Sequence, residues 1–156
     1  MRRMTTLLFV LLACAIPAAA QEVVRPVSQI PLLSMTDGAH DDIESLLQVY
    51  FQAHFNTQAE YAFGRQNLRV GRFDLNGDGK AELVLMVDAP GWHANQGDPF
   101  VVAQWVNKRW VGIGWGWGDE DTIFATTEIQ AGWRSIDTGT QVLRWTGKEY
   151  AFSDKE

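Results

Sequence analysis

Cysteine is almost absent from this chain of 156 residues, since Cys14 is the only one. Cys14 falls within an N-terminal segment that has the composition of a cleaved signal. Without that segment no disulfide can form, so an exported domain must be stabilised by packing or by a metal ion. Five prolines and no internal repeat give no sign of a linker or a second domain.

Basic residues are also scarce, with 13 Lys and Arg against 19 Asp and Glu. Nucleic-acid backbones are recognised by basic faces, so this charge balance argues against a nucleic-acid partner. No apolar run beyond the N-terminal segment is long enough to cross a bilayer. The chain has no G-x-S-x-G motif and no phosphate-binding loop, and its scattered carboxylates have no acid–base spacing. We therefore expect no enzymatic activity.

The first twenty residues have the layout of a secretory signal peptide. Arg2 and Arg3 precede a short apolar run, and residues 18–20 are three alanines that form a cleavage site before Gln21. Cleavage there leaves 136 residues with 11 basic and 19 acidic side chains, a net charge of −8. This predicts a periplasmic or secreted protein, which we expect to be a monomer. The alternative is a lipoprotein, because residues 11–14 resemble a lipoprotein box that would leave Cys14 lipidated.

Residues 21–36 contain Pro26 and Pro31 and are predicted to be a leader segment, followed by a single α+β domain over residues 37–156. Apolar residues at helical spacing predict one helix over residues 41–55, with His54 on its apolar face. Short runs rich in Val, Ile, Phe and Trp then predict an antiparallel β-meander that packs on this helix. The predicted strands are 68–73, 82–87, 100–106, 109–115, 122–127, 141–145 and 149–152, with hairpin turns at Asn107 and Gly147.

The segment FDLNGDGKAELVLMV, residues 73–87, is the strongest candidate for a site. Alternating oxygen-bearing side chains on a curled loop suit calcium, which takes six to eight hard oxygen ligands. Glycines at 77 and 79 permit the positive backbone dihedrals of a tightly wound loop. The alternative is an empty hairpin turn, but the acids would then repel one another without benefit. The loop predicts one Ca²⁺ bound by Asp74, Asn76, Asp78, the carbonyl of Lys80, and Glu82.

This loop resembles the calcium loops of FG-GAP and VCBS repeats, which follow the pattern D-x-[DN]-G-D-G-x-x-D before an apolar strand. The resemblance implies calcium at a β-hairpin and the same five ligand positions. It covers about a tenth of the chain, has Glu82 in place of the last Asp, and occurs once, so no propeller is implied. The stretch from this loop to residue 150 also resembles small exported bacterial proteins of uncharacterised function.

All seven tryptophans lie between Trp92 and Trp145. Trp115 and Trp117 share a face of any extended segment, so that face is either core or a binding strip, and core is favoured. Trp105 and Trp110 are predicted to be a cross-strand pair. Asp88 and residues 118–121 could hold a second cation, although a solvated acidic turn is favoured. The histidines, at positions 40, 54 and 93, have no zinc-ligand spacing in the sequence.

Together these features predict an exported, calcium-binding protein that binds a partner rather than catalysing a reaction. The partner would be another protein or a cell-envelope glycan. One alternative is a metal-free inhibitor or immunity-type protein that acts through the tryptophan-rich loops, with Trp92, Trp115 and Trp117 as contact residues. The other is a carbohydrate or peptidoglycan binder that uses Trp115 and Trp117.

Overall fold

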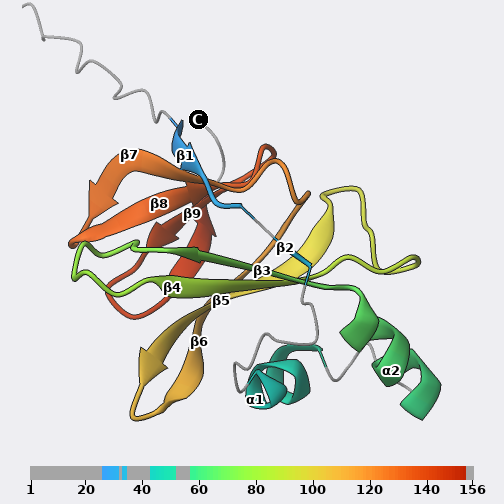
Figure 1. The fold of residues 1–156 in the computed structure, drawn as a ribbon. Coiled ribbons are helices and arrows are strands. Elements are labelled where there is room, and N and C mark those ends of the chain that lie inside the picture. Colours follow the sequence, from blue (N-terminus) through green and yellow to red (C-terminus); the bar gives the residue numbers. More distant parts are fainter. Residues whose placement is uncertain (1–25, 32, 35–42, 52–56, 154–156) are drawn as a thin grey trace, which may run out of the picture.

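The computed structural model describes residues 26–31, 33–34, 43–51 and 57–153 (Figure 1). The predicted signal peptide with Cys14 lies outside the described residues, as do His40 and His54. In the described part of the chain, ten strands form one largely antiparallel sheet in the order β1-β7-β8-β9-β10-β6-β5-β4-β3-β2. The strands are β1 Pro26–Gln29, β2 Leu33–Ser34, β3 Leu68–Phe73, β4 Glu82–Val87, β5 Asp98–Val106, β6 Arg109–Gly118, β7 Phe124–Gln130, β8 Trp133–Asp137, β9 Val142–Trp145 and β10 Tyr150–Ser153.

The sheet consists of two antiparallel meanders, β3 to β6 and β7 to β10, and it curves into a half-barrel. The meanders join where β10 runs parallel to β6, with Tyr150 opposite Gly114. The predicted α+β fold, with helical structure packed on an antiparallel sheet, is confirmed. Strands β3 and β4 have the predicted bounds, and the hairpin turns at Asn107 (φ 50°) and Gly147 (φ 95°) are present.

The helical structure differs from the prediction of one helix over residues 41–55. The α-helix α1, Glu44–Leu46, continues as a π-helical turn, Leu47–Phe51, and residues 52–56 are not described. A second helix, α2 Gln58–Gln66, was not predicted. Its N-terminus has a capping box, in which Thr57 and Glu60 each accept a hydrogen bond from the other's backbone N–H, 3.2 and 3.1 Å. That Thr-x-x-Glu pattern was visible in the sequence.

The segment expected as a leader supplies two strands of the sheet. Strand β1 pairs with β7 at one edge, and β2 pairs with β3 at the other. Between them, Ile30 is fully buried and donates its N–H to the carbonyl of Ile123, 2.9 Å. Because so short a segment reaches both edges, the two ends of the curved sheet must lie close together. The folded unit therefore begins before residue 37.

Strand β4 is buried on both faces and separates two hydrophobic cores. Its even-numbered residues Val84 and Met86 pack with the β7–β10 meander, in a core that includes Ile136, Leu143 and Tyr150. Its odd-numbered residues Leu83, Leu85 and Val87 pack under the helical segments, in a core that includes Ile43, Leu46, Leu47 and Phe51. A strand with both faces covered has an unbroken run of apolar residues in its sequence, as LVLMV at residues 83–87 does.

Strand β6 lies directly against aromatic side chains because it carries glycines at alternate positions. A Cβ atom at Gly116 would lie 2.6 Å from the ring of Phe100, and one at Gly114 would lie 2.5 Å from Tyr150 Cβ. The pairing register shifts between Val102 and Ala103, so Ile113 has no paired residue on β5. Gly112 accordingly faces Tyr50, whose hydroxyl oxygen and ring an added Cβ would overlap. The absence of a side chain at each of these glycines is therefore required for the packing on both faces of β6.

We predict that Gly116→Ala destabilises the fold by about 1–3 kcal/mol, the usual cost of overpacking, although alanine normally suits a strand better than glycine. Phe100→Leu should remove most of that clash. A double-mutant cycle of chemical unfolding should therefore give a smaller cost for Gly116→Ala in the Phe100→Leu background. Equal costs in both backgrounds would show that the contact between residue 116 and the Phe100 ring is unimportant.

Candidate functional sites

The loop between β3 and β4 is wound around the side chain of Asp74. One carboxylate oxygen of Asp74 accepts the backbone N–H groups of Gly77 and Asp78, at 2.7 and 3.2 Å. The other accepts the N–H of Gly79, 2.9 Å. Gly77 and Gly79 have φ of 73° and 83°, as the loop pattern predicts. The loop thus surrounds the Asp74 carboxylate with backbone N–H donors of the loop itself.

The remaining predicted ligands lie in the same loop. Asn76 and Asp78 accept the N–H groups of Asp78 and Lys80, at 2.9 and 2.8 Å, and Lys80 is exposed. The Asn76 amide is 3.3 Å from Glu82 Oε1 and 3.5 Å from Asp78 Oδ2, both at the long end for hydrogen bonds. The side chains of Asn76, Asp78 and Glu82 therefore converge.

Glu82 is the unusual member of this loop because it is only 2 % exposed. Its Oε2 accepts the N–H of Leu75, 2.8 Å. Burial raises the pKa of Glu82 to about 7, hydrogen bonds from backbone N–H groups oppose this, and the charges of Asp78 and Asp74 raise it further. Burial also raises the pKa of Tyr150, and the charge of Glu82 adds to that effect. The buried carboxyl group thus lies in the core near other negative charge.

The loop is also attached to the second meander. Leu75 is buried in the core, and its carbonyl accepts the N–H of Arg134 on β8, 2.8 Å. The Arg134 carbonyl in turn accepts the hydroxyl of Tyr150, 2.7 Å. Hydrogen bonds therefore connect the acidic loop to β8, and β8 to β10.

The tryptophans singled out as contact residues belong to one group of rings. Trp115 lies 5.1 Å from Phe51, 6.2 Å from Tyr50 and 6.1 Å from Trp117, and Phe51 lies 6.2 Å from Trp92, all between ring centroids. We call Tyr50, Phe51, Trp92, Trp115 and Trp117 the aromatic cluster. Phe51 is buried, and the other four are partly exposed. Trp115 and Trp117 are therefore neither a fully buried core pair nor a freely exposed strip.

Trp105 and Trp110 form the predicted cross-strand pair near the tip of the β5–β6 hairpin, with ring centroids 5.1 Å apart. Trp105 is 48 % exposed, whereas Trp110 is buried. Asp88 and Glu120, considered for a second cation, both pair with Arg69, at 2.8 and 3.2 Å. Those two acids therefore have a cationic partner within the protein.

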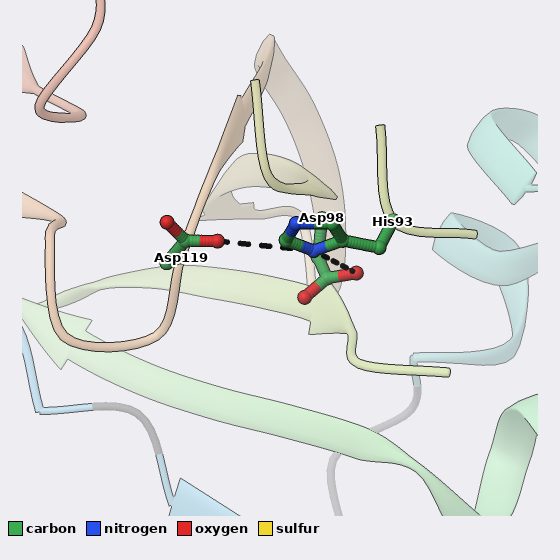
Figure 2. A group of neighbouring side chains, drawn as sticks. All are labelled: His93, Asp98 and Asp119. Carbon is green, nitrogen blue, oxygen red and sulfur yellow. Dashed lines mark ion pairs between the residues drawn. The ribbon is translucent and has the colours of Figure 1, made fainter. Parts of the chain in front are cut away.

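A different cluster joins residues that the sequence did not connect. Among the described residues, one set of three His, Cys, Asp or Glu side chains has ligand atoms within 4.8 Å of one another, namely His93, Asp98 and Asp119. Figure 2 shows the His93 imidazole between the two carboxylates. The sequence could not bring them together, since only the pairing of β5 with β6 places Asp98 beside Asp119.

Comparisons of the chain with protein-family models, curated proteins and solved structures found no match. In the part of the chain that the structure describes, no helix has the length and apolar character needed to cross a membrane. The candidate sites therefore rest on the geometry of this structure and on the local resemblance of the β3–β4 loop.

We predict that Glu82 makes the metal-free protein less stable as the pH rises from about 4.5 to about 7. In that window the unfolded chain has lost its proton from Glu82 while the folded protein retains it, so folding is increasingly opposed. The loss is on the order of 3 kcal/mol, and Glu82→Gln should not show it. Urea unfolding in calcium-free buffer measures this, as the stability difference between Glu82→Gln and wild type at each pH. A difference that does not change with pH would contradict the prediction.

Proposed function

We propose that this protein is an exported calcium-binding protein in which the ion, held by the loop from Asp74 to Glu82, stabilises a surface for a partner. The observation that carries the proposal is the buried carboxyl group of Glu82. It faces Asn76 across a long contact of 3.3 Å, and the nearby charges of Asp78 and Asp74 oppose its ionisation. A divalent cation would reverse that repulsion and favour the ionised form.

The chemistry of the donor atoms fits calcium. Side-chain oxygens of Asp74, Asn76, Asp78 and Glu82, with the backbone carbonyl of Lys80, provide hard ligands at alternate positions along one short loop. The three carboxylates are not all within 4.8 Å of one another, in contrast to the His93 cluster. Ligands on opposite sides of a calcium ion are about 5 Å apart, twice the Ca–O distance, so not every pair of calcium ligands has to lie within 4.8 Å.

The expected role of the ion is structural. Leu75 follows the first ligand, and it connects the loop to β8 through its carbonyl and to the core through its side chain. Fixing the loop would therefore hold the two meanders together. Because the chain beyond the predicted signal has no cysteine, such an ion would serve where other exported domains use a disulfide.

The aromatic cluster is the candidate partner surface. Tyr50, Trp115 and Trp117 are partly exposed and in ring contact with one another through Trp115, and the partly exposed Trp92 is joined to them through the buried Phe51. Partly exposed Trp and Tyr are common at binding interfaces because each has an apolar body and a polar group. The ring faces suit a glycan of the cell envelope, which is the second candidate function. A protein partner, as for an inhibitor, would use the same rings.

We predict that calcium stabilises the protein against heat. In about 10 mM calcium, roughly a hundred times a dissociation constant on the order of 10⁻⁴ M, the gain is about 2.7 kcal/mol, or about 10 °C in melting temperature. Magnesium should substitute poorly, since it needs a small octahedral shell. Differential scanning calorimetry in calcium and in chelator tests this.

Asp78→Asn and Asp137→Asn form a matched pair for that experiment. Each removes one charge from an aspartate that accepts a backbone N–H in a turn, Lys80 for Asp78 and Gly139 for Asp137, both at 2.8 Å. Asp78→Asn should lose the calcium effect, and Asp137→Asn should keep it. If the wild type melts at one temperature in both buffers, the loop is only a turn.

For the partner surface, we predict that Trp117→Ala weakens retention on cell-wall glycan at least tenfold, while Trp105→Ala binds like wild type. Both changes remove a solvent-accessible indole from the same hairpin, but only Trp117 belongs to the aromatic cluster. Co-sedimentation with purified peptidoglycan measures the retained fraction. Equal retention of the two variants would exclude a glycan site at the cluster, and capture of a specific protein lost only in Trp117→Ala would favour the inhibitor-like alternative.

A further inference from the structure

Three segments converge at the end of the β5–β6 pair that lies opposite the hairpin tip. His93 comes from the loop between β4 and β5, Asp98 is the first residue of β5, and Asp119 directly follows β6 (Figure 2). His93 Nδ1 lies 3.5 Å from an oxygen of Asp98 and 3.8 Å from an oxygen of Asp119. Asp98 is buried, whereas the side chains of His93 and Asp119 are 59 % and 53 % exposed.

These distances are too long for a pair of good hydrogen bonds, which are about 2.7–3.2 Å for N–H···O. A single Nδ1 also carries at most one proton, so it cannot donate to both carboxylates. Around a tetrahedral zinc ion with Zn–N and Zn–O distances near 2.0–2.1 Å, neighbouring ligand atoms are about 3.3 Å apart. The two separations measured from His93 Nδ1, 3.5 and 3.8 Å, are close to that edge length, and all three ligand atoms lie within 4.8 Å of one another.

We propose that His93, Asp98 and Asp119 form a binding site for a divalent transition-metal ion, with zinc as the best fit. The ligands are Nδ1 of His93 and one oxygen from each carboxylate. An imidazole nitrogen with two carboxylates suits zinc, whereas calcium prefers six to eight oxygens. The site is separate in sequence and in ligand chemistry from the loop of residues 74–82.

The backbone holds the three residues near one another before any ion binds. Ala94 and Gly97 exchange two backbone hydrogen bonds of 2.9 and 3.1 Å, which close the short turn that follows His93. Gly97 lies so close to the backbone of Gly118 that an added Cβ would be 2.4 Å from its carbonyl carbon. That contact keeps the residues that follow each glycine, Asp98 and Asp119, near one another. A site that is already formed binds a metal at little cost in conformational entropy.

The charge around the cluster also favours a cation. Burial raises the pKa of Asp98, the hydrogen-bonding interaction with His93 and the charge of His93 lower it, and the charges of Asp88 and Asp119 raise it. Arg69, the nearby guanidinium, is paired with Asp88 and Glu120. Because His93 and Asp119 are exposed, a bound ion would keep a coordination position open to water or to a donor atom from a ligand.

Isothermal titration of the chelator-treated protein with zinc chloride tests the site. The wild type should bind one zinc ion, and His93→Ala and Asp119→Asn should each weaken binding at least tenfold, since even indirect partners of a metal site have effects of about that size. Asp121→Asn is the matched control, because it removes the same charge from the same exposed turn without removing a ligand. Titration with cobalt should give visible absorption bands that His93→Ala abolishes.

The two proposed metal sites are distinguished by testing the variant of each site with the ion proposed for the other site. Asp78→Asn should bind zinc like wild type, and His93→Ala should keep its stabilisation by calcium. Both His93→Ala and Asp119→Asn change exposed side chains, so the variants should fold, which circular dichroism checks. If the wild type shows no saturable one-to-one binding, or if His93→Ala and Asp121→Asn bind zinc equally, the cluster is an ion pair and not a metal site.

Discussion

The packing of aromatic side chains against the glycines of β6 is the constraint on which the rest of the structure depends. Tyr150 and Phe100 pack against Gly114 and Gly116 on one face of β6, and Tyr50 packs against Gly112 on the other face. A Cβ atom at any of these positions would come within 2.6 Å of a neighbouring side chain. Through Gly114 and Tyr150 the two meanders become one sheet, and through Gly112 the helical segment reaches the sheet. Close packing of this kind admits no added methyl group without a shift.

The same arrangement explains where the candidate sites lie. Gly114 and Gly116 face the other core, so the large side chains of Trp115 and Trp117 lie on the side of the helical segment, where they complete the aromatic cluster. Asp119 follows the last residue of β6, which pairs with the first residue of β5, so Asp119 lies beside Asp98 and His93. The acidic loop lies elsewhere, at the β3–β4 hairpin, and is joined to β8 by the hydrogen bond from Arg134 to Leu75. Both proposed ions would therefore connect segments that no disulfide can join.

Much of the sheet could be predicted because its signals are local. Strands β3 and β4 have apolar runs ended by glycine-rich turns, and Asn107 and Gly147 mark hairpins by their need for positive φ. The helical residues were harder to predict. Helix α2 has only a weak apolar pattern, and it forms with a capping box at Thr57. Strand β8 was not predicted, since Trp133 and Ile136 are separated by Arg134 and Ser135 and are not in alternation.

By itself the sequence determined the antiparallel α+β class, the acidic loop and its glycines, and the pairing of Trp105 with Trp110, because residues close along the chain carry all of these patterns. Only the tertiary structure decided that β1 and β2 pair at opposite edges of the sheet, that Glu82 is buried, and that His93 meets Asp98 and Asp119. The physical reason is register. Asp98 and Asp119 become neighbours only when β5 and β6 pair along their whole length, and no short stretch of sequence specifies which distant side chains that pairing brings together.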